Sequence, residues 1–425
     1  MGSFWGSLWQ AASGRCAGGV ACVLLALAVA GCSGNTTVGS PQTTASLSPG
    51  APDGQKKGVK VAMLLPLSGS GQTAIIAKAM KQAGELALFE RDSQAVQLLV
   101  KDDKGTPDGA MAAAVDSVRD GADLVLGPLF AKSVTAAAPA VRSAKVAMIA
   151  FSTDRQVAGH GVHLLSFLPG QDVRRVIDYA ASQGRKRYVA LIAGDTTGKI
   201  SEGSFREAVA RNGGTIVALE SYAPASRAAI AEAVQRVRDV VMAAEQQGAP
   251  VDAVFLPGDQ DQVVAIAPML VRAGIDLQRA KLIGTGGLEA QGAAHLDALA
   301  GAWYAGPDPR GWNDFAAKFS KTYGYAPPRI ASQAFDAVSL AIALAGASGG
   351  ARIDEAQLSA GGSFTGVDGS YRLLADGTTE RALAVFEVRK GSAPAVVSEA
   401  PASFGAAPVA GAAATTASAL GSIFN

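Results

Sequence analysis

The alternation of strand-like and helix-like segments from Gly58 onward constrains the fold of this chain more than any other feature. Residues 59–65 form a β-branched and apolar run that ends at Pro66, and residues 75–90 then place apolar side chains at helical spacing. Thr106-Pro107-Asp108 supplies an N-cap, a first-turn proline and a first-turn acid in order, which predicts a helix start. Parallel strands must be joined by crossover connections, so this alternation predicts an α/β fold of mainly parallel sheets with helices on both faces.

The pattern falls into two sets, which predicts two lobes. Strands are predicted at residues 59–65, 96–100, 123–126, 146–150, 188–192, 215–220, 253–256 and 281–283, and helices at 75–90, 131–143, 172–183, 202–211, 227–247 and 262–273. The second set begins near Gln171. The C-terminal part differs: helices are predicted at 312–323 and 330–345, then short strands around 371–374 and 382–389, joined by the hairpin-type turn Asp376-Gly377.

Composition excludes several classes of protein. The chain has 37 Lys and Arg against 36 Asp and Glu, so it lacks the basic surface typical of a nucleic-acid binder. With 49% hydrophobic and 17% charged residues it is too apolar to be disordered, and its 425 residues suffice for two domains with sizeable cores. The longest apolar run, residues 17–30, is shorter than the about 20 residues of a membrane-spanning helix, which argues against a multi-span membrane protein.

The N-terminus predicts export and lipid attachment. Arg15, the apolar run and Gly31-Cys32 provide the charged region, apolar core and small-residue cleavage site of a signal peptide at residues 1–31. Val-Ala-Gly-Cys at residues 29–32 resembles the lipobox of bacterial lipoproteins, which implies that Cys32 is lipidated. The alternative is an ordinary secretory signal with an accidental cysteine. Ser33 resembles the residue that follows the lipidated cysteine in lipoproteins sorted to the outer membrane.

Two segments with little capacity to fold flank the body. Residues 32–57 begin with the anchor cysteine and continue as a predicted flexible tether, and residues 401–425 are a predicted low-complexity tail. Cys16 and Cys22 lie in the segment that cleavage would remove, so the mature domain is predicted to have no internal disulfide.

No catalytic, metal or cofactor signature is complete. His160, His163 and His295 lack metal-ligand spacing and are interpreted as structural. The glycine-rich segments after residues 68 and 283 fail as nucleotide fingerprints, and the G-x-S-x-G match at 346–350 follows a helix rather than a strand. The acid pairs Asp102-Asp103 and Asp259 with Asp261 could serve acid/base chemistry, but solvated loop acids are the simpler interpretation. We therefore predict a protein that is not an enzyme, with no metal and no cofactor.

The loops after the predicted strands offer a binding site instead. Ligands of open α/β sheets bind beyond the carboxyl ends of the strands, where small residues expose backbone N–H groups. The candidate ligand-binding residues in these loops are Ser68, Gly69, Gln72, Phe130, Ser152, Thr153, Asp195 and Asp259. The alternative is that such residues only turn the chain and cap the next helix.

The order of these elements is similar to that of the type I periplasmic-binding proteins of the leucine-binding kind. The strand and loop at 60–69, the segment Leu124-Val-Leu-Gly-Pro128, Ala147–Asp154 and the helix containing Phe335-Asp336-Ala337 carry the resemblance, which covers residues 58–400. It implies a bilobed fold of two doubly wound, mainly parallel sheets with three inter-lobe crossovers. The expected lobe boundaries are 58–167 with 286–365 for lobe 1, and 168–285 with 366–400 for lobe 2.

Two departures weaken an amino-acid site. The resemblance implies an aromatic residue in the loop that here reads Asp195-Thr196-Thr197-Gly198, and an acid for the ligand's amino group near Gly286, where Glu289 is the nearest carboxylate. Ser152 and Thr153 remain as possible donors to a ligand carboxylate.

Two functions remain open. Gly127–Ala131, Ala150–Asp154 and Phe364–Gly369 look like the lipoproteins called penicillin-binding-protein activators, which implies a non-catalytic protein. It would be lipid-anchored at the periplasmic face of the outer membrane and regulate a penicillin-binding protein, the peptidoglycan synthase. The alternative is a substrate-binding lipoprotein of an ABC transporter for an amino acid or similar small polar ligand. Trp303, Tyr304 and Trp312 are candidate partner contacts, with buried core as the alternative.

Overall fold

The computed structural model describes residues 58–91, 94–289, 294–349, 352–359, 362–402 and 404. The predicted signal peptide, Cys32, the tether and most of the tail lie outside these residues. Within the described part, none of the helices combines the length and hydrophobicity needed to span a bilayer.

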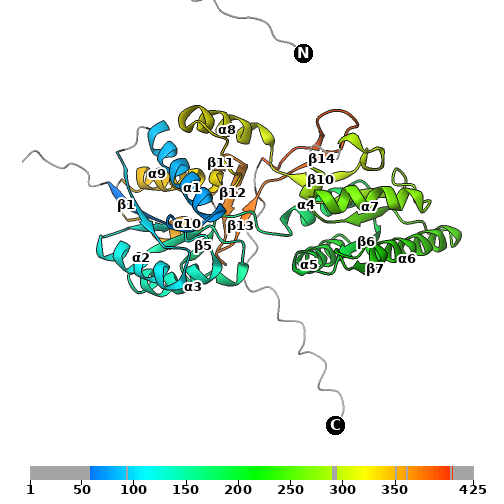
Figure 1. The fold of residues 1–425 in the computed structure, drawn as a ribbon, viewed down its shortest axis with the longest axis horizontal. Coiled ribbons are helices and arrows are strands. Elements are labelled where there is room, and N and C mark those ends of the chain that lie inside the picture. Colours follow the sequence, from blue (N-terminus) through cyan, green and yellow to red (C-terminus); the bar gives the residue numbers. More distant parts are fainter. Residues whose placement is uncertain are drawn as a thin grey trace, which may run out of the picture. The chain divides into compact units, whose positions relative to one another are not determined.

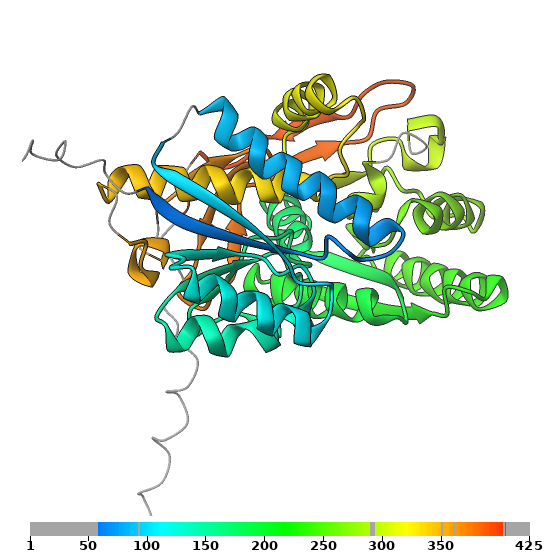
Figure 2. The same cartoon turned by 60° about the vertical axis from the view of Figure 1, so that its left-hand side comes forward.

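The first sheet is entirely parallel and forms the centre of lobe 1 (Figure 1). Its strand order is β2-β1-β3-β4-β5, with β1 Val59–Leu65, β2 Val96–Asp102, β3 Leu124–Leu126, β4 Ala147–Ala150 and β5 Val162–Leu164. Helices α1 (Gln72–Glu90) and α9 (Ala331–Ala347) lie side by side on one face, as Figure 2 shows in blue and gold. Helices α2 (Pro107–Arg119) and α3 (Ala131–Ser143) cover the other face. Each face therefore has its own apolar core.

The second sheet forms the centre of lobe 2 and is mixed. Its strand order is β15-β14-β10-β9-β8-β6-β7, with β6 Arg187–Ala193, β7 Thr215–Tyr222, β8 Ala253–Leu256, β9 Lys281–Gly284, β10 Trp303–Gly306, β14 Ala384–Glu387 and β15 Ala395–Ser398. β6 to β10 pair in parallel, and β14 and β15 add an antiparallel edge. Helices α6 (Arg227–Gln246) and α7 (Gln260–Arg272) cover one face, and α4 (Gln171–Ser182) and α5 (Thr196–Arg211) the other.

A third, small antiparallel sheet packs into the core of lobe 1. It contains β11 (Phe364–Gly366), β12 (Gly369–Leu373) and β13 (Thr379–Arg381), and Tyr371 and Leu373 of β12 are buried in the core beneath α1 and α9. Helices α8 (Pro309–Tyr323) and α10 (Glu355–Ser359) complete the lobe. The turn Asp376-Gly377 does form a hairpin, but its second strand is β13. The prediction of one strand over 382–389 as the hairpin partner is wrong, because β14 pairs with β10 in the other sheet.

The chain passes between the two large sheets three times, as expected. The passages follow β5, β10 and β13. Sheet membership shifts two of the expected boundaries, however. The boundary at 285/286 is displaced because β10 extends the second sheet to Gly306, and that at 365/366 because β12 and β13 pack with lobe 1 as far as Arg381.

Helix α4 ties the third passage between the sheets to lobe 2. The Gln171 side chain donates to the carbonyl of Thr379 and accepts from the Arg381 N–H at 3.2 Å. Arg175 donates to the Leu383 carbonyl at 2.8 Å and to Ser398 at 2.7 Å. One helix therefore holds the third passage and the antiparallel edge of the second sheet.

Candidate strand-end binding site

The candidate residues of lobe 1 gather at one edge of the first sheet. β1, β3 and β4 are neighbours in the parallel sheet, so their carboxyl ends meet at the same edge. Ser68, Gly69 and Gln72 follow β1, Phe130 follows β3, and Ser152 and Thr153 follow β4. Sequence reasoning therefore selected loops that the fold does bring together.

Within this edge, the loop after β1 is held by the end of β2. The backbone N–H of Ser68 donates to the Asp102 carboxylate at 3.2 Å, as does that of Lys104 at 2.9 Å. A side chain at Gly69 would lie 2.8 Å from the Thr73 side chain and 3.0 Å from the Pro66 carbonyl, so it would force Thr73 to shift. Gln72 is exposed and is the first residue of α1.

The loop after β4 presents hydroxyl groups. Ser152 is buried, and its Oγ accepts a hydrogen bond from the Asp154 N–H at 3.1 Å. Its hydroxyl hydrogen is left to donate to a ligand. Thr153 is exposed beside it, and Phe130 presents a partly exposed ring at the start of α3. Donors and an aromatic surface thus occur together at this edge.

Two candidate residues of lobe 2, Asp195 and Asp259, line a cavity of about 330 Å³. Asp195 follows β6, Asp259 follows β8, and the segment Thr285–Gly287 follows β9; these three strands are neighbours in the second sheet. The Asp195 Oδ1 caps α5 by accepting from the Gly198 N–H at 2.8 Å. The Asp259 Oδ1 caps α7 through a reciprocal capping box with Gln262. Helix capping and cavity lining are therefore compatible in both acids.

Sequence reasoning missed several polar groups around this cavity. Thr197 and Ser201 line it from the first turns of α5, which begins at Thr196 instead of the predicted residue 202. Asp195 as an N-cap was the available signal for that earlier start. Tyr222 at the end of β7 was also missed. Burial, with Asp195 and Asp259 nearby, raises the pKa of its hydroxyl to about 12, and this buried hydroxyl has no hydrogen-bond partner among the described residues.

Glu289 is not among the residues that line the lobe 2 cavity. It follows a short 3₁₀ helix, Gly286–Leu288, and is exposed. Gly286 and Gly287 line the cavity at the position where an acid was sought, and neither has a side chain to offer. A side chain at Gly287 would lie 2.3 Å from the Gly258 carbonyl, whereas nothing lies within 4 Å of a side chain added at Gly286, so the close packing of these loops excludes a carboxylate only at residue 287.

Two of the three aromatic contact candidates are buried, so their assignment to a partner surface is wrong. Trp303 donates to Glu387 at 3.0 Å, and Tyr304 stacks on Phe386 with ring centroids 5.3 Å apart. Both belong to the sheet core of lobe 2. Trp312 is partly buried, with the Arg329 guanidinium 4.6 Å from its ring centroid.

Metal chemistry receives no support from the described side chains. Within the described ranges, no group of three or more His, Cys, Asp or Glu residues is placed to hold a metal ion.

Comparison with known proteins identifies a family. A family model described as periplasmic binding protein matches residues 58–393. No curated protein sequence matches the chain significantly.

Solved structures of similar fold cover most of the chain. A putative branched-chain amino acid ABC transporter protein from Rhodospirillum rubrum is 20% identical with a TM-score of 0.69, covering 80% of this chain and 100% of its own. A solute binding protein from Rhodopseudomonas palustris BisB5, in complex with 3,4-dihydroxybenzoic acid, is 22% identical with a TM-score of 0.54, covering 83% and 98%. A substrate-binding protein from Desulfitobacterium hafniense, in complex with Leu, is 20% identical with a TM-score of 0.53, covering 80% and 99%.

Proposed function

This chain belongs to the periplasmic binding protein family, and from that premise we propose that it is the substrate-binding component of an ABC transporter. The observation that carries the proposal is that each of the two large sheets has a polar edge at its strand ends. One offers the hydroxyls of Ser152 and Thr153, and the other surrounds a cavity with the acids Asp195 and Asp259. Ligands of open α/β sheets bind beyond the carboxyl ends of the strands.

The chemistry of the two edges indicates the ligand class. Ser152 and Thr153 can donate to a carboxylate, and the free N–H groups at the starts of α1 and α3 favour an anion there. In the second edge, Asp195 and Asp259 use Oδ1 for capping, which leaves Oδ2 of each to accept from a ligand. We infer a small carboxylic acid that also carries hydroxyl or amino donors. Leucine and 3,4-dihydroxybenzoate, each bound in one of the similar solved structures, are probes of this class.

The test is thermal stability and calorimetry with these two probes and related acids. A ligand at 100 times its dissociation constant should stabilise the protein by about 2.7 kcal/mol. Ser152→Ala should weaken binding roughly 10- to 100-fold, because a hydrogen bond to a charged group contributes about 1.5–3 kcal/mol. Ser143→Ala is the matched control, since Ser143 lies at the far end of α3 and donates only to the Pro139 carbonyl. Equal losses in both variants, or no response to any small acid, would contradict the proposal.

Anchoring forms a separate part of the proposal. We propose that Cys32 carries a lipid that holds the binding domain at a membrane surface in the periplasm. Cys32→Ala should release the protein into the soluble periplasmic fraction. Fractionation of the unmodified protein distinguishes the outer membrane, which Ser33 suggests, from the inner membrane, where a permease would receive the ligand.

One observation favours a second function, the regulation of a penicillin-binding protein. The cleft lacks two groups expected in an amino-acid site, because residue 286 is Gly and Thr196-Thr197 replace an aromatic. A protein that keeps this fold but no longer binds an amino acid would fit the resemblance to penicillin-binding-protein activators. The comparisons support transport better, so we rank this function second. Cross-linking in intact cells that recovers a penicillin-binding protein without permease subunits would reverse the ranking.

A further inference from the structure

Besides the cavity of lobe 2, the protein has a cavity in lobe 1 that lies away from the strand-end loops. It has a volume of about 410 Å³ and lies between the end of α1, helices α8 and α9, and β11. Gln72, a candidate of the strand-end edge, begins α1, whereas Glu90 at the other end of this 19-residue helix lines the cavity. At about 1.5 Å per residue the two helix ends are roughly 27 Å apart. The cavity is therefore distinct from the proposed transport site.

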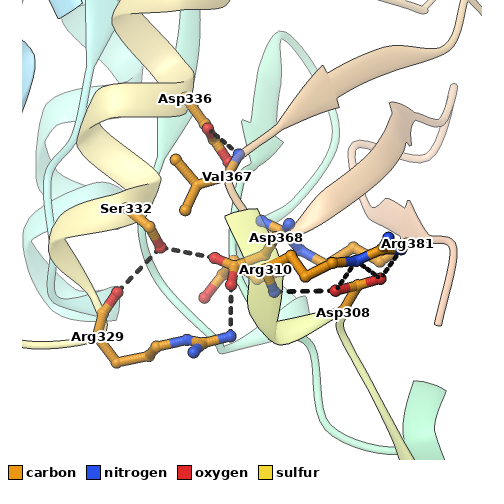
Figure 3. A network of polar contacts seen from close by, with 9 residues as sticks. Asp308, Arg310, Arg329, Ser332, Asp336, Val367, Asp368 and Arg381 are labelled. Carbon is orange, nitrogen blue, oxygen red and sulfur yellow. Dashed lines mark hydrogen bonds and ion pairs between the residues drawn. The ribbon is translucent and has the colours of Figure 1, made fainter. Parts of the chain in front are cut away.

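The floor of the cavity contains two polar atoms that have no hydrogen-bond partner among the described residues, one on Asp336 and one on Ser339. Asp336 and Ser339 are three residues apart on α9 and so face the same side of the helix. The Asp336 Oδ1 accepts from the Val367 N–H at 2.8 Å, as Figure 3 shows. The Asp336 Oδ2 and the Ser339 Oγ, both buried, have no hydrogen-bond partner among the described residues. A buried carboxyl oxygen without a donor is unfavourable, so this floor is incomplete without a bound donor.

The walls are aromatic, and the charges at the rim balance. Phe315 and Phe335 lie edge to face with ring centroids 5.3 Å apart. At the rim, Lys318 pairs with Glu90 at 3.3 Å, and Arg91 and Asp314 contribute one charge of each sign. These four charges cancel, and Asp336 is the remaining charged residue in the cavity lining, because Arg381 and Asp368, which also act on its carboxyl group, do not line the cavity.

The shape of the cavity is fixed by contacts between α9 and the turn after β11. Ser332 donates to the Asp368 Oδ2 at 2.7 Å, and Arg329 forms an ion pair with the same carboxylate (Figure 3). A side chain at Gly366 would lie 2.3 Å from the Asp336 Oδ2, so glycine leaves the room that this oxygen occupies. The Val367 N–H and the close approach of Gly366 therefore hold the Asp336 carboxyl group at the floor of the cavity.

We propose that this cavity binds a small organic cation, a primary ammonium group on an apolar or aromatic body. The ammonium group donates to the Asp336 Oδ2 and the Ser339 Oγ. The body packs on Phe315 and Phe335, whose ring faces also attract a cation. A carboxylate ligand is disfavoured here, because it would meet Asp336 at close range.

Binding of such a cation should depend on pH. Burial raises the pKa of Asp336 to about 7. The charged and titratable groups that act on it are Arg381, Asp368 and Arg91, and the Tyr371 hydroxyl lies in the same cluster. A cation binds the ionised carboxylate, so its affinity should rise about tenfold from pH 6 to pH 8.

The experiment is calorimetric titration of the full-length protein with benzylamine, with benzyl alcohol as the neutral probe and benzoate as the anionic one. We expect benzylamine to bind one site at pH 8, at least tenfold more tightly than benzyl alcohol. Asp336→Asn should weaken it at least tenfold. Because that variant could disturb the bond to Val367, Thr365→Trp at the exposed wall serves as a second variant that obstructs the cavity.

The control is Ser152→Ala in the strand-end edge, which should leave benzylamine binding unchanged. Loss of benzylamine binding in Ser152→Ala would place the amine in the transport site and overturn the proposal. Unaltered binding in Thr365→Trp, or affinity that is the same at pH 6 and pH 8, would overturn it as well.

Discussion

Adjacent carboxylates at the end of β2 meet different surroundings. Burial alone would raise the pKa of Asp102, but hydrogen bonds from Ser68 and from the backbone of Lys104 lower it below its ordinary value. Asp103 is fully buried, and burial raises the pKa of its carboxyl to about 6. Its Oδ1 accepts from the Gly105 N–H at 2.8 Å, whereas its Oδ2 has no hydrogen-bond partner within the described ranges. The sequence shows only two neighbouring acids, because their different pKa values depend on burial and on hydrogen bonds, including one from Ser68 in the loop after β1.

We expect Asp103→Asn to stabilise the fold at pH 8 more than at pH 4. A carboxyl whose folded pKa of about 6 exceeds its unfolded value of 3.8 contributes stability below that lower value, and this contribution disappears as the pH rises through 6. The shift corresponds to about 3 kcal/mol. Asparagine retains the acceptor for Gly105 without a charge. Urea denaturation of both proteins at the two pH values measures the difference; a stability gap that does not change with pH would contradict this account.

At the scale of elements, the long helices and most buried strands followed from the sequence, whereas several short strands, among them β5, β10, β11 and β15, did not. The helix predicted at 131–143 matches α3, and the Thr106 cap forms as expected, with its side chain accepting from the Gly109 N–H at 3.1 Å. β5 and β11 have only three residues each, and β10 and β15 four. Segments this short have no readable period, so pairing with distant strands determines them.

The hairpin of β12 and β13 depends on a glycine in close contact with β5. Gly377 has a φ of +80°, and its carbonyl accepts from the Leu164 N–H at 2.8 Å. A side chain there would lie 2.3 Å from both the Gly159 nitrogen and the Val162 carbonyl oxygen. The hairpin therefore lies too close to the edge of the first sheet for any residue other than glycine at position 377.

Gly377→Ala should destabilise the protein more than Gly184→Ala. Gly184 has nearly the same φ, +79°, but nothing lies within 4 Å of its added side chain. Backbone strain of about 1–2 kcal/mol is common to both variants, so the difference between them measures the collision with β5. We expect Gly377→Ala to lose at least about 2 kcal/mol more in chemical denaturation. Equal losses would show that the hairpin moves away freely.

At the scale of the whole molecule, the sequence predicted two lobes and three passages but not where each passage lies. β10 carries Trp303 and Tyr304 into the second sheet after a segment without a strand pattern, so the second boundary was placed too early. The prediction of the candidate site also depended on which strands could be recognised in the sequence. Strand-end loops were predicted because strand ends are readable in the sequence, whereas Tyr222 became visible only when β7 proved to extend past residue 220.

The three passages predict that one cut near the first of them does not separate the lobes. A specific protease site inserted between Leu168 and Gln171 would divide the chain into two fragments. The core of lobe 1 draws on both: Met63 and Met80 come from the first, and Phe319, Val338 and Leu373 from the second. Burying apolar surface yields about 25 cal/mol per Å², so a core shared between α1 and α9 should hold the fragments together without a covalent bond.

The same site inserted at the 212–214 turn, within lobe 2, controls for damage from cleavage itself. We expect the cut protein to elute as one species in gel filtration and to separate only in denaturant. Two separate fragments in native buffer would mean that each lobe is built from one continuous segment, in conflict with the packing of α1 against α9 in one core.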